Sequence, residues 1–463
     1  MSRLRDRERN AILSSLRAGV VPRVGQQHIQ VGRAAEIKAL ISDIDTLADG
    51  GSAVRFIIGE YGSGKTFFLN LVGSIAREKK LVTVSADLTP DRRIHATGGQ
   101  ARALYAELMR NMATRAKPEG GALASVTERF VTQALQHAEQ SGVSPEAAIQ
   151  AGLDSLMEMH GGYDFASVIK AYWRGHDTDD TELQQAAIRW MRGEYSTRTE
   201  ARTALGVRTI VDDSNVYQSL KLMARFVRLA GFGGLLVTLD ELVNLYKLSN
   251  SQARNANYEQ ILGIVNDALQ GSADGLGVVF SGTPEFLMDP RRGLYSYEAL
   301  QSRLVENRFA REGLVDLSGP VIRLTNLTQE DLYLLLVNVR KVFARGESGE
   351  KLLPDEGLEA FLDHCHHQIG DAYFKTPRNS VKEFTQFLSL LEQNPEVRWD
   401  SLIDKIQVVP ESADQIPDAP EEPPVPAAAP SVNDESAPAH APREDDGDDD
   451  ELTSLKIGVP RHD

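Results

Sequence analysis

A glycine-rich octapeptide matches the phosphate-binding pattern G-x-x-x-x-G-K-[ST] at every defined position. Its residues are Gly59, Glu60, Tyr61, Gly62, Ser63, Gly64, Lys65 and Thr66, and Phe67 follows. Glycines let backbone N–H groups curl around a phosphate, and a following helix adds partial positive charge at its N-terminus. Lys65 has the type and position that reach β- and γ-phosphates, and the Thr66 hydroxyl is a ligand for Mg²⁺. The segment therefore predicts a site for ATP and Mg²⁺.

An acidic pair at the end of a second apolar run supplies the other half of such a site. Residues 235–241 read LLVTLDE. We expect Asp240 to bind Mg²⁺, directly or through water. Glu241 is the expected general base that polarises an attacking water. The alternative for this pair is a helix cap at a strand end, because Asp often begins helices.

Three further polar positions have weaker signals. Thr283 or Ser281, in VVFSGTPE (278–285), would orient the water or touch the γ-phosphate, unless this is an ordinary strand-end turn. Arg303, in LQSRL, is the first choice for an arginine that a neighbouring subunit supplies to the transition state, and the alternative is a solvated basic surface. Arg378, after Thr376-Pro377, would reach the γ-phosphate from a helical lid.

The elements that must position these residues follow from the apolar patterns. Continuous apolar runs at 54–60, 81–87, 233–241 and 275–285 predict buried parallel strands, and 321–327 predicts another. With a helix over 67–80, the order strand, turn, helix, strand is typical of a doubly wound α/β sheet. Between about 98 and 215 the patterns are helical, and helices return at 328–345 and 355–394.

These patterns predict five parts. Residues 1–97 hold an N-terminal segment and the first part of the ATPase core, 98–215 a large helical insertion, 216–327 the rest of the core, 328–409 a helical lid, and 410–463 a tail. Long insertions on such a core usually carry a partner surface.

Charge is concentrated in the tail. Residues 410–463 carry −12 of the formal net charge of −16 and 10 of the 20 prolines. Such a segment cannot bury enough apolar surface to fold, so we expect disorder. An apolar island, LTSLKI (452–457), would be either a docking peptide or a plain disordered end. The body is nearly neutral, which neither favours nor excludes DNA.

Composition also limits the class of protein. A single cysteine, Cys365, excludes an intramolecular disulfide framework and a four-cysteine zinc site, and we expect a reducing, cytoplasmic location. No apolar run spans a membrane and no secretory signal is recognised. The tract HCHH (364–367) is interpreted as a helix face rather than a metal site. Trp173 and Trp190 pack in a core or stack on bases.

The phosphate loop, the acidic strand end and the lid together resemble the AAA+ superclass of ATPases, and Val31-Gly32-Arg33 with Glu36 is similar to the box preceding the phosphate loop in origin-recognition (ORC-like) initiators and loaders. The resemblance implies that Val31, Gly32 and Arg33 lie near the adenine and ribose. It also places Arg303 in the arginine-finger region and Arg378 at the second sensor.

A closer resemblance covers roughly residues 10–400. LRAGVVPRVGQQHIQVGR (16–33), FIIGEYGSGKTFFLNLV (56–72) and ADLTPDRRIHATGGQARALYAELM (86–109) are similar to the ATP-binding proteins of BREX phage-defence loci, the BrxD group. This implies an ATPase, forming homo-oligomers, that loads or regulates a DNA helicase or other defence protein, with direct contact to DNA as an open alternative. The sequence departs from the AAA+ and initiator pattern in two ways. The first sensor is usually Asn, whereas the polar candidates here are Ser281 and Thr283, and too few residues follow the lid for a winged helix.

Two other functions remain open. The first is a nucleotide-gated scaffold or switch with little turnover that binds a protein partner. The second is a kinase acting on a small substrate, although the Asp240-Glu241 pair favours activation of water over an acceptor.

Overall fold

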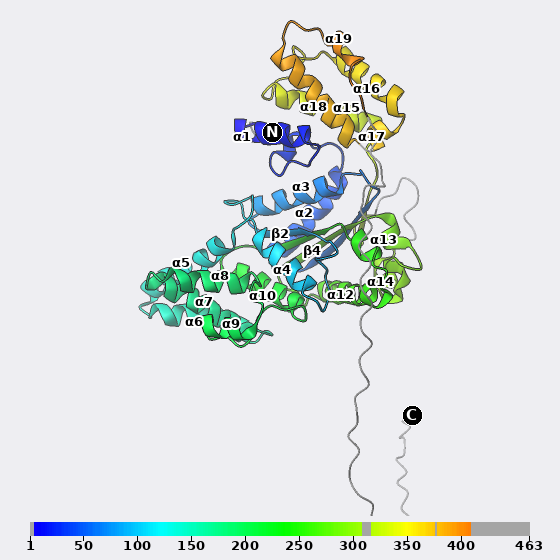
Figure 1. The fold of residues 1–463 in the computed structure, drawn as a ribbon. Coiled ribbons are helices and arrows are strands. Elements are labelled where there is room, and N and C mark those ends of the chain that lie inside the picture. Colours follow the sequence, from blue (N-terminus) through cyan, green and yellow to red (C-terminus); the bar gives the residue numbers. More distant parts are fainter. Residues whose placement is uncertain (1–3, 308–315, 376, 409–463) are drawn as a thin grey trace, which may run out of the picture. The chain divides into compact units, whose positions relative to one another are not determined.

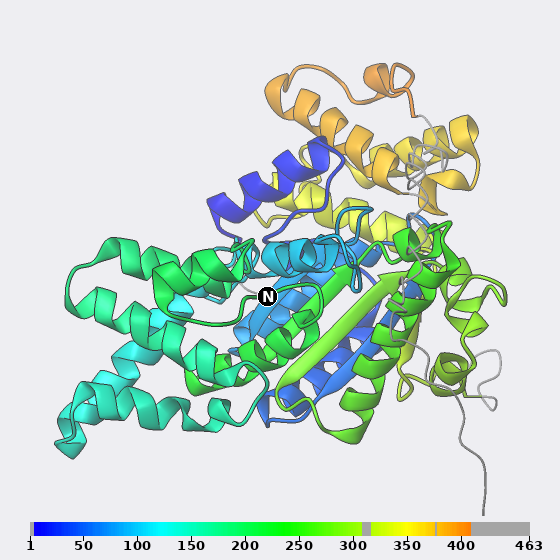
Figure 2. The same cartoon turned by 60° about the horizontal axis from the view of Figure 1, so that its bottom comes forward.

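A parallel β-sheet lies at the centre of the computed structural model, which describes residues 4–307, 316–375 and 377–408. Among these residues the sheet has five strands in the order β2-β3-β4-β1-β5. They are β1 (Ala53–Gly59), β2 (Val82–Asp87), β3 (Leu235–Asp240), β4 (Leu276–Gly282) and β5 (Val321–Leu324). All neighbouring pairs are parallel, as the buried apolar runs predict (Figures 1 and 2).

Side chains of β1 alternate between two hydrophobic layers. Ile57 points into a layer with α2 (Ala34–Ala48) and α3 (Lys65–Glu78), which pack on one face of the sheet. Phe56 and Ile58 point into the layer on the other face, where α4 (Gln100–Arg110), α10 (Val216–Leu229) and α12 (Ser251–Gln270) pack. Figure 1 shows these two sets of helices on opposite sides of the strands. The sheet is therefore buried on both faces, and its side-chain alternation fixes which helices cover each face.

Five helices fill the long interval between α4 and α10, and they lie together in Figures 1 and 2. They are α5 (Leu123–Ser141), α6 (Pro145–Met157), α7 (Gly162–Asp177), α8 (Thr181–Met191) and α9 (Arg198–Leu205). Trp190 is buried there, so it packs in the core rather than presenting a face for stacking on bases.

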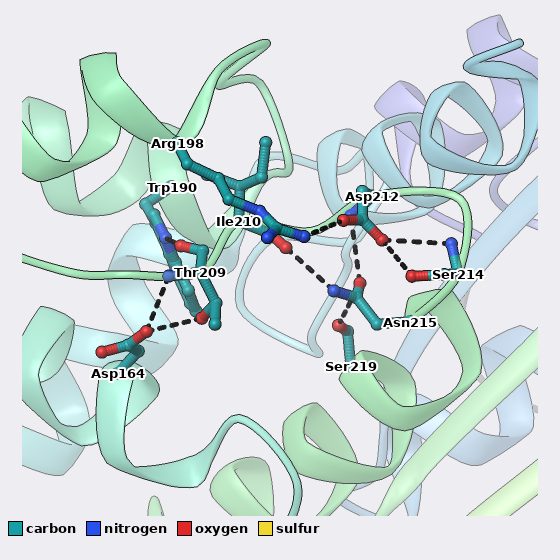
Figure 3. Close-up of polar contacts among 9 residues, drawn as sticks. All are labelled: Asp164, Trp190, Arg198, Thr209, Ile210, Asp212, Ser214, Asn215 and Ser219. Carbon is teal, nitrogen blue, oxygen red and sulfur yellow. Dashed lines mark hydrogen bonds and ion pairs between the residues drawn. The ribbon is translucent and has the colours of Figure 1, made fainter. Parts of the chain in front are cut away.

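The segment that leads from α9 back to α10 is fixed by a network of polar contacts (Figure 3). Asp164, a buried carboxylate, accepts hydrogen bonds from the Arg208 N–H at 3.0 Å and from the N–H and hydroxyl of Thr209 at 2.8 and 2.6 Å. The Trp190 indole donates to the Thr209 carbonyl at 2.8 Å. Asp213 accepts from the N–H groups of Gly99 and Arg102 at the start of α4. This segment thus joins the five helices to the core.

Short elements connect β3, β4 and β5. They are α11 (Val243–Tyr246), α13 (Pro284–Met288), the 3₁₀ turn η2 (Leu294–Ser296) and α14 (Glu298–Leu304). The N-terminal helix α1 (Asp6–Arg17) and the 3₁₀ turn η1 (Gln26–His28) precede α2.

The C-terminal helices have a hydrophobic core of their own. They are α15 (Gln329–Phe343), α16 (Asp355–Ile369), α17 (Ala372–Lys375), α18 (Arg378–Gln393) and α19 (Asp400–Ile403). Gly370, whose φ is 54°, ends α16, and the helical region predicted over 355–394 consists of the three helices α16, α17 and α18. Ile12 and Leu13 of α1 belong to this core, which no local pattern indicates.

The tract HCHH lies on α16, where Cys365 is buried and His364 contacts the Ile406 carbonyl. The described ranges contain no group of three or more His, Cys, Asp or Glu side chains arranged to hold a metal. They also contain no helix with the length and apolar character that crossing a membrane requires. The predicted tail, 410–463, lies outside the described residues.

Candidate nucleotide site

The glycine-rich segment joins the end of β1 to the start of α3. Gly62 and Gly64 have φ angles of 82° and 84°, in the left-handed region that favours glycine. A Cβ on Gly59 would overlap the Ser63 hydroxyl and lie 2.8 Å from the Leu324 carbonyl oxygen. The chain therefore needs glycine at these positions to curl tightly in front of the helix, as the motif predicts.

Lys65 is the first residue of α3, and its ammonium lies inside the curl of the loop. Lys65 Nζ donates to the carbonyl oxygens of Gly59 and Glu60, each at 2.9 Å. Burial lowers the pKa of this lysine, and the nearby Asp240 and Glu241 carboxylates oppose the shift. A cation is thus held where the loop would hold phosphates, with backbone carbonyls as partners that a phosphate would replace.

Thr66 and Asp240 meet although 174 residues separate them. The Thr66 hydroxyl donates to Asp240 Oδ2 at 2.7 Å. Mg²⁺ takes oxygen ligands at 2.0–2.1 Å in an octahedron, where adjacent oxygens lie about 2.9 Å apart. The hydroxyl and the carboxylate therefore have the chemistry and the spacing of two adjacent Mg²⁺ ligands, and water and phosphate oxygens usually complete such a shell.

Glu241 follows directly and has a strained backbone. Its φ of 59° is left-handed, which in a residue other than glycine costs roughly 1–3 kcal/mol and is typical of functional sites. Its N–H donates to Asp240 Oδ1 at 2.8 Å. Burial raises the pKa of the Glu241 carboxyl, as does the adjacent Asp240, whereas Lys65 lowers it. A carboxyl with a raised pKa beside a cation suits proton abstraction from water.

These groups open onto a cleft of about 810 Å³, within the 300–1,000 Å³ that small-molecule sites occupy. Its walls come from four regions of the described chain: the N-terminal segment, the phosphate loop with α3 and the strand ends, residues 92–119 around α4, and the C-terminal helices. Apolar side chains line part of it, among them Val20, Val21, Pro22, Ile29, Val31, Leu327, Leu335 and Val381. The cleft thus offers both a polar edge for phosphates and apolar surface for a base.

Several predicted residues line this cleft. Tyr61 and Phe67 do so on either side of the loop glycines, and Arg378 does so at the start of α18. Val31 and Arg33 line it too, but the Arg33 guanidinium contacts protein rather than projecting freely. It donates to the Ser63 carbonyl at 3.4 Å and the Thr325 hydroxyl at 3.2 Å. The predicted contact of residues 31–33 with adenine and ribose remains a prediction.

Thr283 is not among the residues that line the cleft. Its side chain accepts from the Phe286 N–H at 3.4 Å and caps α13, which is the strand-end turn that the sequence left open. Ser281 is fully buried at the end of β4, and its hydroxyl has no hydrogen-bond partner among the described residues. Neither side chain lines the cleft with Lys65 and Glu241, although the Ser281 carbonyl accepts from the Leu242 N–H at 3.1 Å.

Arg303 also lies away from the cleft of its own chain. It is exposed on α14, where Nε donates to Asn266 Oδ1 at 2.6 Å and Nη1 donates to the Ala299 carbonyl at 2.7 Å. An action on its own cleft is therefore not supported, whereas an action on a neighbouring subunit remains a prediction.

Sequence reasoning missed Asp87, the last residue of β2. It is directly opposite Asp240 in the strand register and lines the cleft. Desolvation, followed by Asp240, raises its pKa, while Arg92 and Arg23 lower it. The signal was present, because the predicted strand 81–87 ends in a carboxylate and the carboxyl ends of parallel strands share one edge.

Comparison with known families gives a match along most of the chain. The family model described as "BREX system ATP-binding protein BrxC/D" matches residues 4–407, which include the loop, the acidic strand end and the C-terminal helices. Comparison with curated proteins finds no significant match.

Proposed function

This chain belongs to the BREX system ATP-binding protein BrxC/D family, and from that premise we propose that it binds ATP with Mg²⁺ in the cleft and hydrolyses it. One observation carries the proposal. Thr66 and Asp240, predicted as the two protein ligands of one Mg²⁺, come from opposite parts of the sequence and lie 2.7 Å apart. When bound, Mg²⁺ would neutralise phosphate charge and hold the β- and γ-phosphates.

Water is the acceptor that this site favours. Glu241 lies next to Asp240, and its pKa is raised by burial and by Asp240, whereas the positive charge of Lys65 lowers it. In this arrangement Glu241 orients and deprotonates a water molecule at the γ-phosphate, and Lys65 stabilises the developing charge. Arg378, which lines the cleft at the start of α18, would add a second cation. A kinase would need an acceptor site in place of this carboxylate pair.

The AAA+ and ORC-like part of the proposal rests on sheet order and on the arginines. Strand β4 lies between β1, which carries the phosphate loop, and β3, which carries Asp240. Arg303 lies exposed on α14, where a second copy of the chain could receive it. We therefore propose a homo-oligomer in which Arg303 acts in trans on the nucleotide site of a neighbouring subunit.

In phage defence, we propose that ATP turnover loads or regulates a DNA helicase or another DNA-processing protein. The five helices α5–α9 provide the partner surface in this proposal, because they are inserted between β2 and β3 and joined to α4 through Asp213. The alternative is that the chain binds DNA directly. Pull-down with DNA and with the neighbouring gene products, each with and without ATP, distinguishes direct DNA binding from binding to a protein partner.

A nucleotide-gated switch with little turnover is the second candidate. This function is favoured by one observation: the N-terminal segment and the C-terminal helices both line the cleft. ATP bound there would hold these parts in one arrangement without being consumed. Steady-state turnover, measured with and without DNA, distinguishes an ATPase from such a switch.

Replacement of Asp240 by Asn tests the Mg²⁺-dependent ATPase directly. Loss of the ligand charge should raise the Mg²⁺ concentration for half-maximal hydrolysis roughly tenfold or more. Asp45→Asn is the matched control, because Asp45 is an exposed partner of Lys79 outside the cleft. An unchanged Mg²⁺ requirement in Asp240→Asn would remove Asp240 from the metal site.

A further inference from the structure

The N-terminal helix and the C-terminal helices form one hydrophobic unit, so the chain crosses between this unit and the sheet twice. Helix α1 packs against α15 and α18, and Arg9 of α1 donates to the Val342 and Phe343 carbonyls at the end of α15. The first crossing comprises residues 18–33 and the second comprises residues 325–328, between β5 and α15. Both crossings contribute residues to the nucleotide cleft.

Arg33 lies where the two crossings meet the phosphate loop. It has a left-handed backbone, with φ at 60°, directly before α2. Its guanidinium donates to the Thr325 hydroxyl at 3.2 Å, to the Thr325 carbonyl and to the Ser63 carbonyl at 3.4 Å. It also forms an ion pair with Glu36, at 3.8 Å, and interacts electrostatically with Asp331. One side chain of the first crossing therefore holds both the second crossing and the phosphate loop.

The backbone beside Arg33 is packed against the first turn of α15. A Cβ on Gly32, whose φ is also 60°, would lie 3.3 Å from Asp331 Oδ1. Asp331 and Thr328 form the capping box that begins α15, with reciprocal hydrogen bonds of 3.1 and 3.0 Å. A displacement of the phosphate loop that moves Arg33 would thus be transmitted to the point where α15 starts.

Arg55 shows what a purely structural arginine looks like in this fold. It is buried near the start of β1, where it forms two hydrogen bonds with Asp43, of 2.6 and 2.8 Å, and donates to the Leu317 carbonyl at 2.9 Å. Its partners lie outside the cleft, and its carboxylate partner neutralises it fully. The charge of Arg33 is opposed by Glu36, at 3.8 Å, and by Asp331, and its guanidinium donates to the Ser63 carbonyl of the loop and to Thr325 of the connector.

We propose that Arg33 is a positioning residue that couples occupancy of the phosphate loop to the α1/α15–α19 unit, rather than a contact to adenine or ribose. The inference rests on the proposed binding of ATP. A planar guanidinium can hold the Ser63 and Thr325 carbonyls at once, whereas an ammonium acts as a point charge and an amide lacks the reach and the charge. Without the Arg33 bridge, the phosphate loop should still bind nucleotide, but binding should no longer change the α1/α15–α19 unit.

Hydrogen exchange with adenylyl imidodiphosphate, a non-hydrolysable ATP analogue, tests this. In the full chain we expect the analogue to slow the exchange of amides in residues 325–336. In Arg33→Gln the analogue should still bind, as measured by calorimetry. The factor by which the analogue slows amide exchange in residues 325–336 should fall about tenfold, which corresponds to the loss of one charged hydrogen bond. Arg33→Lys should lie between the two. Arg198→Gln, which removes an exposed ion pair with Asp212, should behave as the unmodified chain.

The outcomes separate this inference from the proposed function. If the unmodified chain binds no analogue, the proposed function and this inference both fail. If it binds the analogue but Arg33→Gln and Arg33→Lys show the same slowing as the unmodified chain, the inference alone fails. Binding without any slowing in the unmodified chain also overturns it. An Arg33→Gln variant that misfolds leaves the decision to Arg33→Lys, whose result supports or refutes the coupling by the same criterion.

Discussion

Replacement of Lys65 by Ala should weaken ATP binding strongly while leaving the fold intact. The ammonium lies inside the phosphate loop, held by two carbonyl oxygens at 2.9 Å, and it faces Asp240 and Glu241. In the complex these carbonyls give way to phosphate oxygens. A hydrogen bond to a charged group contributes about 1.5–3 kcal/mol, which corresponds to a roughly 10- to 150-fold increase in the dissociation constant.

Stability should change little in this variant, for two opposing reasons. The alanine removes a positive charge that stabilises the two nearby carboxylates, which lowers the stability of the fold. It also removes the cost of desolvating the ammonium, which raises the stability. We therefore expect the loss to appear in the binding isotherm and not in the thermal midpoint. Titration calorimetry with ATP and Mg²⁺ measures the first, and circular dichroism on heating measures the second.

Lys79→Ala is the matched control. Lys79 follows the end of the same helix, α3, and forms an exposed ion pair with Asp45, and such pairs contribute about 0–1 kcal/mol. The control should bind ATP as the unmodified chain does. If Lys65→Ala binds ATP within twofold of the control, our assignment of the loop lysine to the phosphates is wrong.

Two other predictions concern regions outside the catalytic edge. Arg303→Ala alone should abolish hydrolysis if Arg303 acts on a neighbouring subunit. A mixture of Arg303→Ala and Lys65→Ala subunits should recover part of the activity, because some interfaces then pair an intact Lys65 site with an intact Arg303. No recovery of hydrolysis at any mixing ratio would count against action in trans. Cys365 is fully buried and burial raises the pKa of its thiol to about 12, so at pH 8 its thiolate fraction should be far below that of a free cysteine with a pKa of about 8.5. Alkylation of Cys365 should therefore require unfolding of the C-terminal helices, and rapid labelling of the native chain, followed by mass spectrometry, would show that this core opens readily.

The sequence predicted the strands and both halves of the nucleotide site because their signals are local. Buried parallel strands appear as continuous apolar runs, and the phosphate loop needs glycine at fixed positions for steric reasons. The contact between Thr66 and Asp240 could be expected as well, since the ends of parallel strands meet at one edge of the sheet.

What the sequence could not predict depends on distant or competing contacts. The partners of Arg33 include Thr325, 292 residues away, and only the folded chain brings that residue close. Thr283 or Ser281 was expected to orient the water or touch the γ-phosphate, with a strand-end turn as the alternative; the Thr283 hydroxyl caps the short helix α13, a local interaction that threonine commonly makes, and its contact with a nucleotide stays a prediction. The inclusion of α1 in the C-terminal core likewise depends on packing, because its apolar residues indicate a buried helix face and not which core receives it.

The central claim is that this cleft hydrolyses ATP with Glu241 as the base, and Glu241→Gln tests it most directly. We predict that the variant binds ATP and Mg²⁺ as tightly as the unmodified chain, while its steady-state turnover falls about 10²- to 10⁴-fold, the range expected for loss of a general base. Normal turnover by Glu241→Gln, with ATP bound equally well, would contradict the account.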